Sequence, residues 1–316
     1  MVSYSKKILT FFVLLQLAVA YGASGQQTGG TYDILQEPRS NLIPYHSRAA
    51  ALENIPDSSS WVLREYEPWE HEEAEDHSLW TTRYKIPRQW GGRSVIFRVE
   101  GVPSPFMLEV NNETAGYAQS GIGRTEFDIT SMLKDDYNTI AVRIYKNAAT
   151  NKSEDHRQHN DLRFRDAFML AQPRIRVRDI TASTLVEPDG RGILSMGVIM
   201  ASAMRNPYEY TVHYELIDRE GKVASSGSRE FTTSWFSEDT LRFATTLPGV
   251  KPWNHETPNL YTLVVRSFHE GRNVEFVTAK IGFRNISYSN GSVLLNGRQV
   301  KLAPSEAAYL SNERRS

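Results

Sequence analysis

From residue 78 onward the chain consists of short apolar or alternating runs, each ended by turn-forming residues. Glycine, asparagine and aspartate stand between the runs, as at Gly91-Gly92, Asn111-Asn112 and Asp135-Asp136. Alternation with a period of two places successive side chains on opposite faces of a strand, and such runs at short spacing are typical of antiparallel β-sandwiches. Helical periodicity is scarce, so we predict an all-β fold.

The predicted strands fall into two groups. The first group comprises Leu79–Ile86, Ser94–Val99, Phe106–Val110, Glu126–Ile129, Thr139–Tyr145 and Ala167–Leu170. The second group comprises Ile175–Ile180, Ile193–Ala201, Glu209–Ile217, Lys222–Phe231, Thr240–Leu247, Tyr261–Phe268 and Asn273–Ile281. Seven strands at short spacing suit an immunoglobulin-like sandwich. Gly116 to Gly123 has no helix after it and is interpreted as a hairpin or bulge.

Pro173 separates the two groups, because it removes a backbone donor between them. We therefore predict one domain over residues 78–172 and a second over residues 173–284. Residues 26–77 are polar, acidic and interrupted by proline. They are expected to form an extended arm that can contribute strands to the first domain, with a short helix at Arg48–Glu53.

The N-terminus has the pattern of a secretory signal peptide. Lys6 and Lys7 precede an apolar run from Ile8 to Ala20, and small residues follow. The run is shorter than the ~20 residues that span a bilayer, so a retained transmembrane helix is the weaker alternative. Residues 1–25 are accordingly excluded from the fold.

The amino-acid composition indicates the cellular compartment of the protein and the class of its partners. The chain has no cysteine, and export without disulfides fits a bacterial periplasm, because a chain of this length can stabilise a core by packing alone. Its 36 basic and 37 acidic side chains give a net charge of −1. This balance provides no electrostatic basis for binding nucleic acid or an acidic membrane surface, so neutral partners are favoured.

Ordered sequence blocks carry a family resemblance across about residues 41–302. Blocks at 79–93, 97–102, 110–120, 125–130 and 137–143 are followed by Pro252-Trp253 through Leu260-Tyr261-Thr262-Leu263, then Gly282-Phe283-Arg284 and Leu295-Asn296-Gly297. Together they resemble glycoside hydrolase family 2, especially bacterial β-galactosidases. The resemblance implies a galactose-binding-like jelly-roll β-sandwich followed by an immunoglobulin-like β-sandwich. It also implies that Trp253 and Tyr261 pack the core and that Asn296-Gly297 turns a hairpin.

The resemblance places the family's chemistry beyond these domains. Its two catalytic glutamates lie in a (β/α)8 barrel, which needs roughly 200 residues or more. Residues 285–316 correspond to the start of a linker to that barrel. No catalytic residue is therefore assigned, and the chain is expected to be inactive alone, although the family hydrolyses terminal β-D-galactosides by a retaining mechanism.

Departures from the family pattern bear on sugar binding. The loop that supplies an aspartate to the sugar and to a bound sodium is replaced by Glu154 to Asp161, and only Phe164-Arg165-Asp166 fits well after it. The ligands with which family members bind sodium and magnesium are not recognisable, so no metal and no cofactor are predicted. The candidate carbohydrate contacts are Asp155, His156, Asp161, Trp69 and Trp235. For the loop residues the alternative is a solvated loop, and for the tryptophans it is core or interface packing.

Three functions remain open at this point. The chain is the N-terminal part of a β-galactosidase, a stand-alone carbohydrate-binding protein, or a structural module whose mark would be a stable oligomer. The expected partner in the first two cases is a β-galactoside or a polysaccharide.

Overall fold

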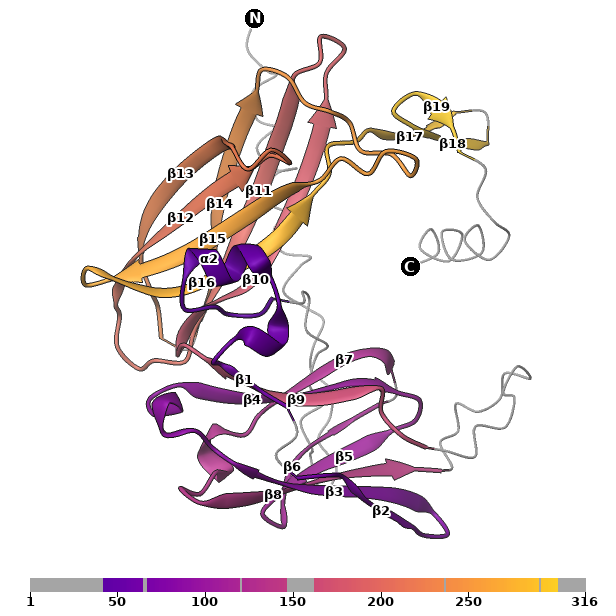
Figure 1. The fold of residues 1–316 in the computed structure, drawn as a ribbon, viewed down its shortest axis with the longest axis vertical. Coiled ribbons are helices and arrows are strands. Elements are labelled where there is room, and N and C mark those ends of the chain that lie inside the picture. Colours follow the sequence, from indigo (N-terminus) through magenta and orange to yellow (C-terminus); the bar gives the residue numbers. More distant parts are fainter. Residues whose placement is uncertain are drawn as a thin grey trace, which may run out of the picture. The chain divides into compact units, whose positions relative to one another are not determined.

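The computed structural model describes residues 42–64, 67–119, 121–146, 162–235, 237–289 and 291–300. The all-β prediction is confirmed, because 59% of the described residues are strand and 6% are helix. Figure 1 shows two groups of strands, one coloured mainly indigo to magenta and one running from pink-red through orange to yellow. Neither α2 (Arg48–Glu53) nor any other helix within the described ranges is long and apolar enough to cross a bilayer.

The first sandwich is made of two antiparallel sheets. One has the order β1 (Val62–Leu63), β9 (Asp166–Gln172), β4 (Ser94–Val102) and β7 (Gly121–Asp128). The other has the order β2 (Glu70–Glu73), β3 (His77–Lys85), β8 (Tyr137–Tyr145), β5 (Phe106–Val110) and β6 (Glu113–Ala118). The short 3-10 turns η1 (Pro56–Ser58), η2 (Arg88–Trp90) and η3 (Thr130–Met132) join its segments.

Period-two alternation builds the core of this sandwich. Every second residue of β8 is buried, including Ile140, Val142 and Ile144, and Phe97 and Val99 of β4 point to the same core. Since each strand has one face toward the opposite sheet, the intervening residues of β4 and β7 lie on the outer face of their sheet. That outer face carries the candidate site described below.

The second sandwich contains seven strands, as the sequence predicts. One sheet has the order β10 (Ile175–Val186), β11 (Gly192–Ser202) and β14 (Glu238–Leu247). The other has the order β13 (Val223–Thr232), β12 (Glu209–Ile217), β15 (Tyr261–His269) and β16 (Arg272–Ile281). Tyr261 belongs to the buried core between them, and Trp253 is half-buried, with Gly282 packed closely against its ring.

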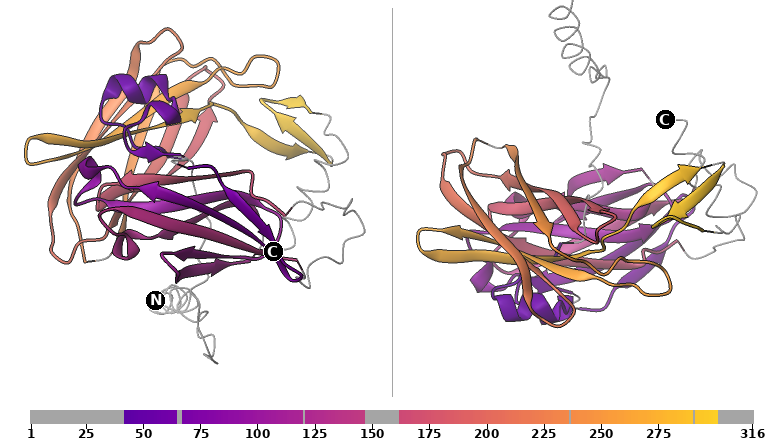
Figure 2. Two further views of the ribbon diagram at one scale, coloured as in Figure 1. Left: turned by 60° about the horizontal axis from the view of Figure 1, so that its bottom comes forward. Right: turned by 90° about the horizontal axis from the view of Figure 1, so that it is seen from above.

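The arm contains the predicted short helix, α2 (Arg48–Glu53). Ser47 caps its start by accepting a hydrogen bond from the Ala50 amide at 3.2 Å. The helix lies against β15 and β16 (Figure 2). Just before it, Tyr45 exchanges two backbone hydrogen bonds with Phe276, of 2.8 and 2.9 Å, and thereby adds the arm to the edge of β16.

A third buried cluster joins the two sandwiches. The outer face of β4 and β9 contributes Ile96, Phe168 and Leu170, and the second sandwich contributes Val264 and Phe276. The arm fills the space with apolar side chains, namely Ile43, Tyr45 and Ala51. The outer face of the first sheet is therefore partly an interface, not a solvent face.

A small sheet follows the second sandwich, made of β17 (Ile286–Ser289), β18 (Ser292–Leu295) and β19 (Arg298–Gln299). Asn296 and Gly297 have φ values of 49° and 79° between β18 and β19, so the predicted hairpin turn is confirmed. One prediction missed an element: the interval from Gly116 to Gly123 holds the second half of strand β6 and the start of β7. Because β6 is an edge strand with an exposed beginning, its apolar alternation is weak.

Candidate functional site

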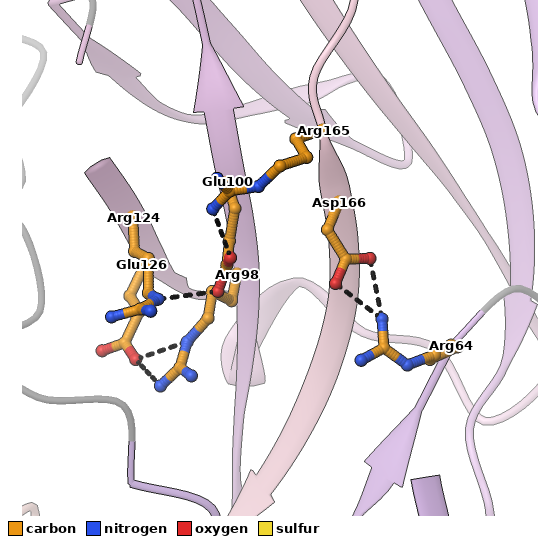
Figure 3. A network of polar contacts seen from close by, with 7 residues as sticks. All are labelled: Arg64, Arg98, Glu100, Arg124, Glu126, Arg165 and Asp166. Carbon is orange, nitrogen blue, oxygen red and sulfur yellow. Dashed lines mark hydrogen bonds and ion pairs between the residues drawn. The ribbon is translucent and has the colours of Figure 1, made fainter. Parts of the chain in front are cut away.

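A network of charged side chains covers the outer face of the sheet β9-β4-β7 (Figure 3). Strand register creates it, because Arg98 lies opposite Glu126 and Glu100 lies opposite Arg124. Opposite charges on facing positions of neighbouring strands attract each other. We call Arg64, Arg98, Glu100, Arg124, Glu126, Arg165 and Asp166 the anchor network.

Glu100 is the centre of one half of this network. Its Oε1 accepts from Arg124 Nε at 2.8 Å, and its Oε2 accepts from Arg165 Nη2 at 3.0 Å. The Arg165 backbone amide also donates to the Glu100 carbonyl, at 2.8 Å. Arg165 is thus held by both its main chain and its side chain.

A β-bulge brings the two segments this close. The pairing of β4 with β7 shifts between Glu100 and Val102, and the intervening Gly101 has a φ of +67°. A Cβ on Gly101 would stand 2.8 Å from Arg165 Cβ. Glycine is therefore required here for its backbone conformation and for the close approach of Arg165.

The other half of the network links the two sandwiches. Arg98 donates to Glu126 through Nε at 3.1 Å, and only 2% of its side chain is exposed. Arg178 of β10 approaches the second oxygen of Glu126 at 3.5 Å. Buried charges are tolerated when they are paired and hydrogen-bonded. The contacts of Glu126 with Arg98 and Arg178 therefore hold the two sandwiches against each other.

Asp166 is held from the arm. Arg64 Nη1 donates to both of its carboxylate oxygens at 2.7 Å, and the guanidinium lies 4.7 Å from the centroid of Phe168. Burial lowers the pKa of Arg64, but hydrogen bonds to Asp166 and Asp57 outweigh burial and raise the pKa above its ordinary value. The arm and the start of β9 are therefore joined by a charge-assisted contact.

The anchor network acts by holding segments of the chain in place. Each of its carboxylates, Glu100, Glu126 and Asp166, accepts hydrogen bonds from at least one guanidinium. A glycosidase acid and nucleophile instead face each other across a cleft with one pKa raised. Within the described residues no cluster of three or more His, Cys, Asp or Glu side chains could hold a metal ion. What the network does is fix the chain from Phe164 to Asp166, directly after the loop that the family resemblance singles out.

The predicted site residues have different surroundings. Asp155, His156 and Asp161 lie outside the described residues. Trp69 is half-buried and packs edge-to-face on Phe164, with ring centroids 4.8 Å apart. Trp235 is 68% exposed. The described structure brings neither tryptophan into the anchor network, and the role of all five residues in carbohydrate binding stays a prediction.

The sequence patterns alone do not predict the anchor network. Its signal is the run Phe97-Arg98-Val99-Glu100, where charged residues occupy every second position of an otherwise apolar strand. Such alternation normally means a solvent-facing side, and nothing local indicates that a second domain covers it. The opposite charges at Glu126 and Arg124 are the signal in the sequence that indicates pairing with Arg98 and Glu100.

Known proteins resemble this chain in their sequence. Residues 175–284 match the family model of the glycosyl hydrolases family 2. A β-galactosidase of Priestia megaterium is 26% identical over 274 residues, which are 79% of this chain and 26% of that protein. The chain therefore resembles glycoside hydrolase family 2, whose model matches its second sandwich. It spans about a quarter of the length of the curated β-galactosidases from Priestia megaterium and Clostridium acetobutylicum.

Solved family 2 structures show the same fold. A putative β-galactosidase from Bacteroides fragilis superposes with a TM-score of 0.63 and 19% identity, over 84% of this chain and 43% of that one. A β-glucuronidase from Bacteroides uniformis gives a TM-score of 0.65 and 16% identity, over 72% of this chain and 29% of that one. At these identities the likeness concerns the fold alone.

Proposed function

We propose that this chain is the non-catalytic, sugar-orienting N-terminal part of a family 2 glycoside hydrolase that acts on terminal β-D-galactosides. The observation that carries the proposal is the fixation of Phe164, Arg165 and Asp166. Phe164 is buried between Trp69 and Trp80, Arg165 binds Glu100, and Asp166 binds Arg64. These three residues fit the family pattern directly after the loop that contributes an aspartate to the sugar.

The physical role of such fixation is preorganisation. A loop that touches a substrate contributes most when its ends are held by rigid elements, because less conformational entropy is then lost on binding. Here one end of the loop segment leaves β8 and the other enters β9, and β9 is paired with β1 and β4. The two sandwiches supply the frame, and the chemistry belongs to the barrel of the family.

The same proposal includes export. The signal-like segment at residues 1–25 supports transfer across the inner membrane, and the absence of cysteine supports a periplasmic location. The N-terminal sequence of the protein recovered from its own cells tests this. A first residue near position 26 is expected, and an intact Met1 would contradict export.

Two measurements test the function. The purified 316-residue chain should release no nitrophenol from 4-nitrophenyl β-D-galactoside, whereas native protein precipitated from its own cells by an antibody against the chain should hydrolyse that substrate. Turnover by the purified chain would contradict the non-catalytic role. An inactive native precipitate would contradict the β-galactosidase assignment.

A variant pair then tests the anchor network. Arg165→Ala in the native protein should raise KM for the galactoside, because the loop segment is less well held, with kcat changed less. Arg219→Ala removes an exposed arginine of the second sandwich and serves as the matched control. Equal KM values for the two variants would remove the anchor role of Arg165.

A further inference from the structure

A cavity of about 380 Å³ lies where the Gly91-Gly92 turn of the first sandwich meets strand ends of the second sandwich. We call it the junction cavity. The lining residues that matter here are Gly92, Arg93, Arg174, Tyr208, Tyr210 and His269. Its volume is within the range of small-molecule sites, at the low end, which suits one or two sugar rings.

One wall of the junction cavity is aromatic and rigid. The rings of Tyr210 and His269 are stacked, with centroids 4.6 Å apart and planes at 6°. Tyr208 meets His269 edge-on at 5.6 Å. The Nδ1 atom of His269 lies 2.7 Å from the carbonyl oxygen of Glu209, and donation of the Nδ1 proton to that oxygen fixes the ring. Prepositioned aromatic faces bind a flat apolar ring face with little loss of conformational entropy.

The opposite wall is cationic. The Arg93 guanidinium stacks on Trp61 at 3.7 Å from the ring centroid, and its buried Nη1 atom has no hydrogen-bond partner within the described part of the chain. Arg174 is exposed, and its Nη2 atom donates to the Ala203 carbonyl at 3.2 Å. Neither guanidinium is paired with a carboxylate among the described residues. Unused donors on two guanidiniums are suited to a carboxylate, which they can bind in a planar, charge-assisted geometry.

Carboxylates also lie near these groups. Arg176 has a buried Nε without a partner in the described residues, and the charges of Glu126 and Glu275 act on it. Glu270 Oε1 lies 3.8 Å from His269 Nε2. The guanidiniums among the residues that line the cavity itself are those of Arg93 and Arg174.

We propose that the junction cavity is an accessory binding site for an acidic sugar, a uronosyl residue of a polysaccharide. The pyranose face stacks on Tyr208, whose ring stands nearly perpendicular to that of His269, and the carboxylate at C6 accepts hydrogen bonds from Arg174, with the charge of Arg93 beside it. The site belongs to the two sandwiches themselves and does not depend on the hydrolytic activity proposed above. It would attach the protein to an acidic glycan while the reaction takes place elsewhere.

Calorimetric titration of the full chain with α-1,4-linked digalacturonic acid tests the proposal, and α-1,4-linked digalactose is the neutral partner of the same linkage. One acidic disaccharide should bind per chain, and the neutral disaccharide should bind at least tenfold more weakly. The imidazole proton signals of His269 should shift in NMR spectra on addition of the acidic disaccharide only. No binding of digalacturonate, or equal affinity for the two disaccharides, would overturn the proposal.

Variants locate the binding. Arg174→Ala and Tyr208→Ala should each weaken the affinity for digalacturonate about tenfold, which corresponds to about 1.4 kcal/mol. Arg219→Ala alters an exposed residue outside the cavity and should leave the affinity within twofold. Unchanged affinity in both cavity variants, or loss of affinity in Trp235→Ala alone, would place the binding elsewhere. Displacement of digalacturonate by an equal concentration of acetate would reduce the site to a carboxylate site without sugar stacking.

The result of the titration can be distinguished from the result of the assay that tests the proposed function. The assay for β-galactoside hydrolysis uses the native protein and a neutral substrate, whereas the titration uses the isolated chain and a disaccharide that is not cleaved. Because Arg174 is exposed, Arg174→Gln offers a second variant of similar shape if Arg174→Ala is poorly folded.

Discussion

Glu275 makes the stability of the second sandwich depend on pH in an unusual direction. The side chain is fully buried in β16, and its Oε1 accepts the Val177 amide of β10 at 2.6 Å. Burial raises the pKa of Glu275 from 4.5 to about 7, although the Val177 hydrogen bond and the charges of Arg176 and Arg93 oppose that rise. The folded protein therefore holds a proton that the unfolded chain releases.

The free energy follows from the two pKa values. Between pH 4.5 and about 7 the folded state binds more protons than the unfolded state, so the free energy of unfolding falls as pH rises through this window. Each unit of pKa difference corresponds to about 1.4 kcal/mol. Glu275 should therefore cost about 3 kcal/mol of stability at pH 8 that it does not cost at pH 4.

Glu275→Gln isolates this contribution. The amide oxygen can still accept the Val177 amide proton, and no charge is buried at any pH. Urea unfolding followed by tryptophan fluorescence should give nearly equal free energies of unfolding for the two proteins at pH 5. At pH 8 the variant should be more stable, and the difference between the proteins should increase by about 2–3 kcal/mol over this range.

Other titrating groups cancel in this difference, because they are present in both proteins. A difference that stays flat between pH 5 and pH 8 would refute the reasoning, as would one that favours the wild type at pH 8. The denaturant dependence must be the same in both proteins for the comparison to hold.

Three further variants test the anchor network. Gly101→Ala should lower the free energy of unfolding by about 1–3 kcal/mol, since alanine disfavours the positive φ and its Cβ would meet Arg165; a thermal midpoint equal to that of the wild type would contradict this. Arg98→Ala should cost about 3–5 kcal/mol because Glu126 would stay buried with a weaker partner, and the double variant Arg98→Met with Glu126→Leu should recover much of that loss in the same urea titration. Arg64→Ala should cost no more than about 1 kcal/mol, since its ion pairs are partly exposed, and a larger loss would show that the arm is held mainly by charge.

Local sequence patterns were sufficient for most of the strands. Phe106–Val110 and Glu209–Ile217 have the predicted bounds, because an apolar residue occupies every second position in both. The helix at Arg48–Glu53 was equally predictable from its alanines. Glu113–Ala118 was not, since an edge strand needs only one buried face and this one is mostly exposed at its start.

The candidate site was much less predictable, because its contacts are non-local. Arg98 and Glu126 are 28 residues apart and meet only through the register of β4 with β7. The burial of Arg98 depends in addition on a second sandwich that packs over it, together with Arg178. Trp69 is an aromatic residue in a polar segment, and this local pattern suggested a sugar contact. Its half-burial on Phe164 depends on how the arm folds back, which the local pattern does not indicate.

The pairing of Tyr45 with Phe276 has a consequence for synthesis on the ribosome. The arm is translated early, but the strand edge that it completes follows about 230 residues later, which at 5–20 residues per second is roughly 10–50 s of elongation. During that interval Ile43, Tyr45 and Ala51 have no partner from β16. The nascent chain therefore carries an apolar segment that stays uncovered until the last strands of the second sandwich emerge.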